Sequence, residues 1–70
     1  MYEILIINWG KKAQEKISIE EYQNFVQQHA YKKYAKTFSE VMQIVGGRPY
    51  RQRAGYSAFH GNIEYIITQC

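Results

Sequence analysis

Residues 53–68 have the sequence Arg53-Ala-Gly-Tyr-Ser-Ala-Phe-His-Gly-Asn-Ile-Glu-Tyr-Ile-Ile-Thr68, in which two runs of β-prone residues flank a Gly-Asn pair. A two-residue turn that begins with glycine is typical of a β-hairpin, because glycine accepts the positive φ that such a turn requires. The turn at Gly61 and Asn62 places His60 opposite Ile63 and Tyr56 opposite Ile67. One side of the hairpin then collects a core face, Ala54, Tyr56, Ala58, Ile63, Tyr65 and Ile67, and the other side collects Arg53, Ser57, Phe59, Glu64, Ile66 and Thr68.

A third strand is predicted at the start of the sequence, over residues 2–8. This segment, Tyr2-Glu-Ile-Leu-Ile-Ile-Asn8, has apolar side chains at both even and odd positions. Such a run suits a strand that is central in its sheet or covered on both sides. The polar residues 11–16 that follow are expected to form a solvated loop.

Two capping boxes predict two helices. Ser18-Ile-Glu-Glu21 places a helix start at Ile19, and Thr37-Phe-Ser-Glu40 starts a second helix, which the pair Gly46-Gly47 ends. A continuous helix over residues 19–45 would be roughly 40 Å long at about 1.5 Å per residue, which is too long for a domain of this size. A bend is therefore expected near Lys33–Lys36.

These elements predict an α+β fold in a single domain covering residues 1–70. The order is β-α-α-β-β, with a three-stranded antiparallel sheet that carries both helices on one face. Gly55 is expected at a β-bulge. Such a short chain leaves no room for a cofactor domain, and no cofactor is expected.

The positive charge of the chain is concentrated in its middle. Residues 32–53 hold six of the nine Lys and Arg residues but only one acidic residue, Glu40, whereas the whole chain has a net charge of +3. A basic segment of this kind indicates a face that meets something negative. Tyrosines lie within the same segment, and tyrosine and arginine are enriched among the anchors of protein interfaces.

The sequence therefore predicts a non-enzymatic binding protein that docks a basic face on an acidic protein or a ribonucleoprotein. Inhibitors and adaptors of phage or mobile elements are the class of small protein that this description fits best. The candidate binding residues are Tyr31, Lys32, Lys33, Tyr34, Lys36, Arg48, Tyr50, Arg51, Arg53 and Phe59.

Single-stranded RNA or DNA is the alternative partner. Arg51 and Arg53 are expected to share the open face of the sheet with Phe59. There the arginines could hold phosphates, and the rings of Phe59 and Tyr50 could stack on bases. A homodimer formed through exposed strand edges is a further alternative, because it would bury the tyrosines.

A small ribonuclease toxin is the second functional alternative. His60, with Arg53 and Tyr56, could supply general acid-base catalysis. Ribonuclease toxins of the double-stranded-RNA-binding fold carry Gly-Ser-His after a strand, but this chain has Gly55-Tyr-Ser57 in that place, so their activity is not carried over. No metal site is expected, since two histidines, no Asp and a single cysteine offer too few ligands.

The cellular location is expected to be cytoplasmic. Cys70 is the single cysteine, which excludes an internal disulfide, and no secretory signal is apparent. The apolar run Ile4-Leu-Ile-Ile7 is too short for a membrane span.

Overall fold

The computed structural model describes residues 1–69, so Cys70 lies outside the described residues. Five strands, two α-helices and one 3-10 helix follow one another along the chain. Their bounds are β1 Tyr2–Asn8, η1 Gly10–Gln14, α1 Ile19–His29, β2 Tyr31–Ala35, α2 Phe38–Val45, β3 Tyr50–Gln52, β4 Gly55–His60 and β5 Ile63–Gln69. The α+β class is therefore confirmed.

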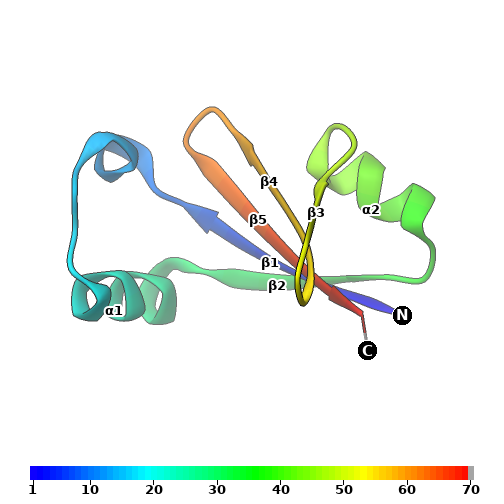
Figure 1. Cartoon of the computed structure of the whole chain (residues 1–70), viewed down its shortest axis with the longest axis horizontal. Coiled ribbons are helices and arrows are strands. Elements are labelled where there is room, and N and C mark those ends of the chain that lie inside the picture. The colour runs from blue at the N-terminus through cyan, green and yellow to red at the C-terminus, as the bar shows by residue number, and fades with distance from the viewer. Residues whose placement is uncertain (70) are drawn as a thin grey trace.

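The strands form one antiparallel sheet in the order β2-β1-β5-β4-β3. The first and last strands of the chain, β1 and β5, are neighbours in the middle of the sheet, and β2 and β3 form its two edges. The helices lie at opposite ends of the sheet (Figure 1). The prediction of a three-stranded sheet is wrong, because β2 and β3 are additional edge strands.

The predicted hairpin is confirmed in its register. His60 faces Ile63 and Tyr56 faces Ile67 across β4 and β5, and Gly61 has the expected positive φ of 61°. The expected core face is confirmed for Tyr56, Ala58, Ile63, Tyr65 and Ile67, which all belong to or pack on the main hydrophobic core. Ala54 is the exception, since it is exposed in the turn before β4.

Strand β2 replaces the bend that the sequence predicted between two helices at Lys33–Lys36. Its five residues pair with β1 from Tyr2 opposite Ala35 to Ile6 opposite Tyr31. The physical reason is the hydrogen bonding of β1, whose central position requires a partner for its backbone on both edges. Four of the five residues of β2 are exposed, so its side chains give no apolar pattern from which a strand could be predicted.

Strand β3 is also absent from the prediction, and its pairing with β4 gives Gly55 a different place in the sheet from the expected one. Arg53 and Ala54 form a two-residue turn, and Gly55 pairs with Gln52 in the regular β3–β4 register. The expected β-bulge at Gly55 is therefore wrong. Its φ of 151° and the carbonyl oxygen of Ile67, which a Cβ at this position would overlap, explain the glycine.

Both predicted helix starts are confirmed by their caps. The Ser18 hydroxyl accepts a hydrogen bond from the Glu21 amide at 3.1 Å, and the Thr37 hydroxyl accepts one from the Glu40 amide at 3.2 Å. Helix α2 ends as predicted, since Gly46 adopts the left-handed conformation with a φ of 86°. Residues 11–14, expected in a loop, belong to the 3-10 helix η1.

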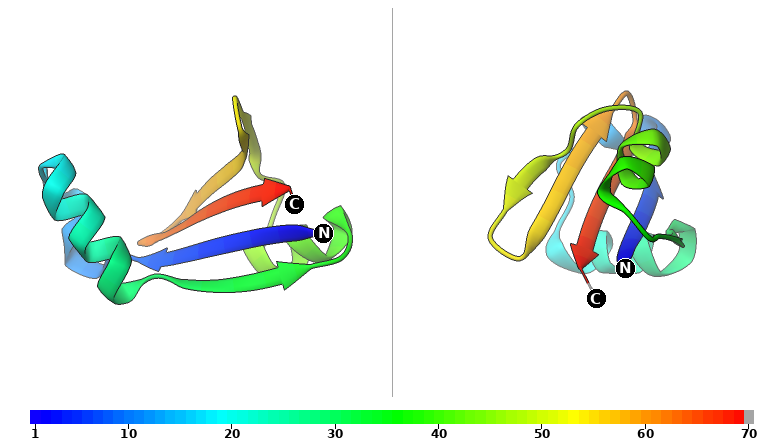
Figure 2. Two further views of the ribbon diagram at one scale, coloured as in Figure 1. Left: turned by 90° about the horizontal axis from the view of Figure 1, so that it is seen from below. Right: turned by 90° about the vertical axis from the view of Figure 1, so that its right-hand side faces the viewer.

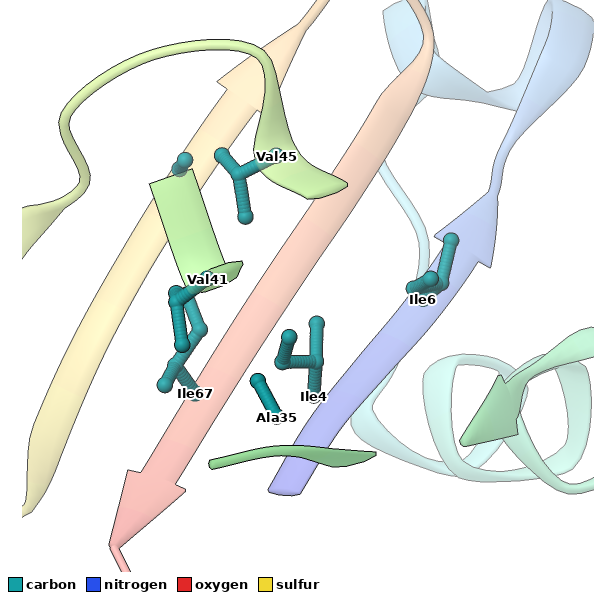
Figure 3. Close-up of a cluster of buried hydrophobic side chains, with 7 residues drawn as sticks. Ile4, Ile6, Ala35, Val41, Val45 and Ile67 are labelled. Carbon is teal, nitrogen blue, oxygen red and sulfur yellow. The ribbon is translucent and has the colours of Figure 1, made fainter. Parts of the chain in front are cut away.

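Helix α2 covers one face of the sheet, which we call the α2 face. Val41 and Val45 of this helix pack with the inward side chains of the strands, and the whole buried cluster is Ile4, Ile6, Ala35, Val41, Val45, Ala58 and Ile67. Figure 3 shows these side chains between α2 and the strands β1 and β5.

Helix α1 packs on the other face, which we call the α1 face. Trp9, at the end of β1, stacks on Phe25 of α1 and donates a hydrogen bond to Glu64. Glu64 alternates along β5 with Ile63 and Tyr65, which pack on the α2 core, so its side chain points to the opposite side. Ile7, which faces Glu64 in register and is fully buried, is therefore covered from the α1 side.

The prediction that both helices lie on one face is thus wrong. The views in Figure 2 show α1 at one end of the strands and α2 at the other. The alternating apolar residues of β1 explain this arrangement, because Ile4 and Ile6 face α2 whereas Leu5 and Ile7 face the other way. Each helix covers part of one face, and the remainder of the α1 face carries no helix.

Candidate binding surface

The ten candidate binding residues do not form one continuous face. Those from Tyr31 to Lys36 lie on or next to β2, whereas those from Arg48 to Arg53 lie on or next to β3. These two strands are the opposite edges of the sheet. Four strand spacings of about 4.8 Å separate them by roughly 19 Å.

Three arginines surround the edge strand β3. Arg48 lies in the segment before β3, Arg51 lies within it, and Arg53 lies in the turn that follows it. All three residues are exposed. Within residues 1–69, none of them forms an ion pair with a carboxylate, and the ion pair that does occur joins Lys32 to Glu3.

Arg51 borders a hollow with an aromatic wall on the α2 face. It is paired with Tyr56, so both side chains project on the same side of the sheet. The hollow is lined by Tyr2, Phe38, Arg48, Pro49, Arg51 and Tyr56. The Phe38 ring packs between two tyrosines, with its centroid 5.9 Å from that of Tyr2 and 5.0 Å from that of Tyr56.

A second hollow adjoins the first. It is lined by Arg51, Gln52, Arg53, Ala54, Gly55, Tyr56 and Gln69. Arg51 and Tyr56 therefore belong to both hollows. No described acidic side chain lines either of them, so this edge of the protein presents positive charge beside aromatic surface.

The position predicted for Arg51 on an open face with Phe59 is wrong. Arg51 projects on the α2 side, whereas Phe59 is paired with Glu64 and projects on the α1 side. The pattern of β4 predicts a strand that continues back through residue 53, but the turn at Arg53 and Ala54 separates β4 from β3. Tyr50, opposite Ser57, and Gln52, which donates a hydrogen bond to the Ser57 hydroxyl, are the residues of β3 that share the α1 face with Phe59.

The candidate residues on β2 are divided between the two faces. Lys32 and Tyr34 project on the α1 side, and Tyr31 and Lys33 project on the α2 side. The Lys32 ammonium lies 3.6 Å from the Glu3 carboxylate, and both groups are accessible to water, so this pair adds little stability. Lysines on an edge strand hinder pairing with another chain, which gives them a structural role at this position.

Tyr2, Phe38 and Tyr56 line this surface but are not among the ten candidate binding residues predicted from the sequence. They come from β1, α2 and β4 and meet only because β1 is paired with β5 in the middle of the sheet. No local pattern marks them as neighbours. The aromatic residue next to Arg48 and Arg51 in the sequence, Tyr50, projects on the other face.

His60 and Arg53, two of the residues considered for a ribonuclease site, do not lie close together. His60 ends β4, and Arg53 precedes the start of the same strand. A six-residue strand is roughly 20 Å long, which places the two side chains beyond joint contact with one phosphate. In the described part of the chain, no three side chains among His, Cys, Asp and Glu gather as ligands for a metal ion.

Among the described residues, no helix has the length and apolar character that crossing a membrane requires. A scan against protein-family models finds no match for this chain, and searches of curated proteins and of solved structures find none either. The arguments about function therefore rest on the surface itself.

Proposed function

We propose that this chain is a non-enzymatic binding protein of the inhibitor or adaptor kind, which docks the β3 edge on an acidic protein surface. The observation that carries the proposal is the group Arg48, Arg51 and Arg53, which surrounds an edge strand without an acidic neighbour among the described residues. Arginine is suited to such a surface because its planar guanidinium binds a carboxylate through two parallel hydrogen bonds.

The surroundings of the arginines also favour a protein partner. No strand of residues 1–69 pairs with the outer edge of β3, so its backbone can pair with an extended segment of a partner. Tyr50 is 75% exposed and stands on this strand as a large side chain that a partner would bury. Buried tyrosines and arginines contribute much of the binding free energy at interfaces.

The test is an affinity pull-down from cell lysate with the tagged protein, in parallel samples with and without nuclease, analysed by mass spectrometry. A protein that is retained in both samples, and lost with the double variant Arg51→Ala, Arg53→Ala, supports the proposal. The matched control is Lys11→Ala, Lys16→Ala, which removes the same charge from two exposed residues outside β3. Equal loss with both double variants would show a general charge effect and contradict the proposal.

Single-stranded nucleic acid on the α1 face is the second candidate function. Tyr34, Tyr50 and Phe59 project on this face and are each more than half exposed, so bases could stack on them. However, the same face carries three carboxylates, Glu3, Glu15 and Glu64, against two lysines, Lys12 and Lys32, and these carboxylates would repel phosphates. We therefore favour the protein partner.

The two candidates differ in their response to salt. Single-stranded nucleic acid should lose affinity with a log-log slope of about −0.7 per phosphate contact. Recovery that disappears with nuclease, together with such a slope for a labelled oligonucleotide, would support the second candidate over the first.

A further inference from the structure

A third hollow lies on the α1 face, beside helix α1. Aromatic rings from three separate elements line it, namely Trp9 after β1, Tyr22 of α1 and Phe59 of β4. The carboxylates of Glu64 and Glu15 also line this site. It is distinct from the two arginine hollows, with which it shares no residue.

The Trp9 ring is held in place from several directions. Its indole N–H donates to the Glu64 carboxylate at 2.9 Å, and its backbone N–H donates to the Asn62 carbonyl at 2.8 Å. One stacking partner, the Phe25 ring, lies 4.5 Å away at an interplanar angle of 10°. Trp9 is only 6% exposed, so the indole forms a fixed wall of the site.

Two further rings complete the aromatic wall. The Tyr22 centroid lies 5.3 Å from that of Trp9. Phe59 is 51% exposed although it lies on a strand with a buried neighbour, Ala58. A phenylalanine that stays half in water contributes little to the core, and at this site its ring is accessible to a ligand.

The charges around the site favour a cation. Glu15 and Glu64 supply two negative charges, against one positive charge from Lys12, which also lines the site. The Lys12 ammonium lies 5.7 Å from the centroid of Phe25, the ring on which Trp9 stacks, so this aromatic cluster already attracts one cation. Burial raises the pKa of the Tyr22 hydroxyl, and the negative charge of Glu64 raises it further.

We propose that the site formed by Trp9, Tyr22, Phe59 and Glu64 binds an alkylammonium group. The faces of aromatic rings attract such a cation through their quadrupole, and a carboxylate beside the rings adds a direct charge interaction. A methylated ammonium fits this chemistry best, because it forms cation-π contacts without needing hydrogen-bond acceptors for N–H groups.

The experiment uses choline and its neutral isostere 3,3-dimethylbutan-1-ol, which has the same shape without the charge. Binding is measured in the full chain by the NMR signal of the indole N–H, which is unambiguous because Trp9 is the single tryptophan. Choline should bind roughly 2- to 30-fold more tightly than the isostere if cation-π contacts act here. Equal binding of both compounds, or no shift with either, would overturn the proposal.

The variant Glu64→Gln tests the carboxylate without removing the acceptor for the indole N–H. It should weaken choline binding by about fivefold and leave the isostere unaffected. Glu3→Gln is the matched control, because Glu3 projects on the same face but lies four residues from the position that pairs with Glu64. An equal effect of both variants would show that Glu64 acts only as a general surface charge, which would contradict the assignment.

Phe59→Leu tests the exposed ring with a residue of similar volume. It should reduce the preference for choline over the isostere, and an unchanged thermal unfolding temperature would show that the fold is retained. An unchanged preference would remove Phe59 from the site.

A separate arm of the same experiment tests the source of the ammonium group. A peptide that contains trimethyl-lysine and binds more tightly than choline would indicate a lysine side chain of a protein, and the reverse order would indicate a small free ammonium compound. The double variant Arg51→Ala, Arg53→Ala should leave choline binding unchanged. Failure of this inference and failure of the proposed function are therefore distinguishable.

Discussion

Ile4 of β1 and Ile67 of β5 face each other at the centre of the sheet, and neither side chain is exposed to solvent. The pair joins the first strand of the chain to the last, and Val41 of α2 belongs to the same buried cluster. The main core therefore depends on a contact between segments that are far apart in the sequence.

Ile67→Ala should destabilise the protein by about 2–5 kcal/mol, because it removes buried methyl groups and leaves a cavity. Ile19→Ala is the control, since the same atoms are removed from a side chain that is 78% exposed. The control should change the free energy of unfolding by less than about 0.5 kcal/mol. Urea denaturation followed by circular dichroism measures both, and similar values for the two variants would contradict the described core.

Gly55→Ala should destabilise the hairpin of β3 and β4. Its φ of 151° is unfavourable for a residue with a side chain, and a Cβ here would overlap the Ile67 carbonyl oxygen. The backbone conformation alone costs of the order of 1–3 kcal/mol.

Gly47→Ala is the matched control for Gly55→Ala. A Cβ at this position would meet the His60 side chain at 3.7 Å, which is an ordinary contact. Thermal unfolding should show a marked decrease for the first variant and little change for the second. A well-folded Gly55→Ala protein with wild-type stability would show that β4 and β5 do not approach as described.

The edge strand β2 should become a site of association when its lysines are removed. The double variant Lys32→Thr, Lys33→Val leaves an edge with high β-propensity and no positive charge next to two exposed tyrosines. Sedimentation velocity should show concentration-dependent dimers or larger species.

Lys11→Thr, Lys16→Val serves as the control for charge and solubility, since both residues are exposed outside the strands. This variant should remain in the same state as the unmodified chain. If the β2 variant also stays unchanged up to high concentration, the lysines do not protect this edge.

The raised pKa of Tyr22 predicts a dependence of stability on pH in the alkaline range. Burial is the larger cause, and the charge of Glu64 adds to it. In the unfolded chain the hydroxyl loses its proton near the ordinary value of 10.0, whereas in the folded chain it holds the proton to higher pH. The stabilisation is thus fully present below pH 10 and is lost as the pH rises through the folded value.

The comparison of the unmodified protein with Tyr22→Phe isolates this contribution, since the two proteins differ only in the Tyr22 hydroxyl. The difference in unfolding free energy should be constant below pH 10 and should shift in favour of the variant above it. A difference that is independent of pH throughout would contradict the environment described for Tyr22.

The elements with local signals could be predicted from the sequence. Ser18 and Thr37 mark helix starts through their own side chains, and Gly61 fixes the register of β4 and β5 through its turn. These features depend on residues within a few positions of one another. Strand β1 could also be predicted, because its run of β-branched residues can be recognised without information about its partner strands.

The two edge strands could not be predicted in the same way. Residues in β2 and β3 are almost all exposed, so the alternation that marks a half-buried strand is missing. Their strand conformation comes from the hydrogen-bonding needs of their neighbours. This error placed Arg51 on the wrong face and joined the two basic tracts into one surface, although the sheet holds them apart.

The central pairing of β1 with β5 has a consequence for synthesis on the ribosome. Asn8, the last residue of β1, pairs with Ile63, the first residue of β5. At ~5–20 residues per second, about 3–11 s pass between the synthesis of these two positions. During this interval the apolar segment of β1 lacks its partner β5. The topology of the sheet therefore sets how long this segment is exposed to chaperones.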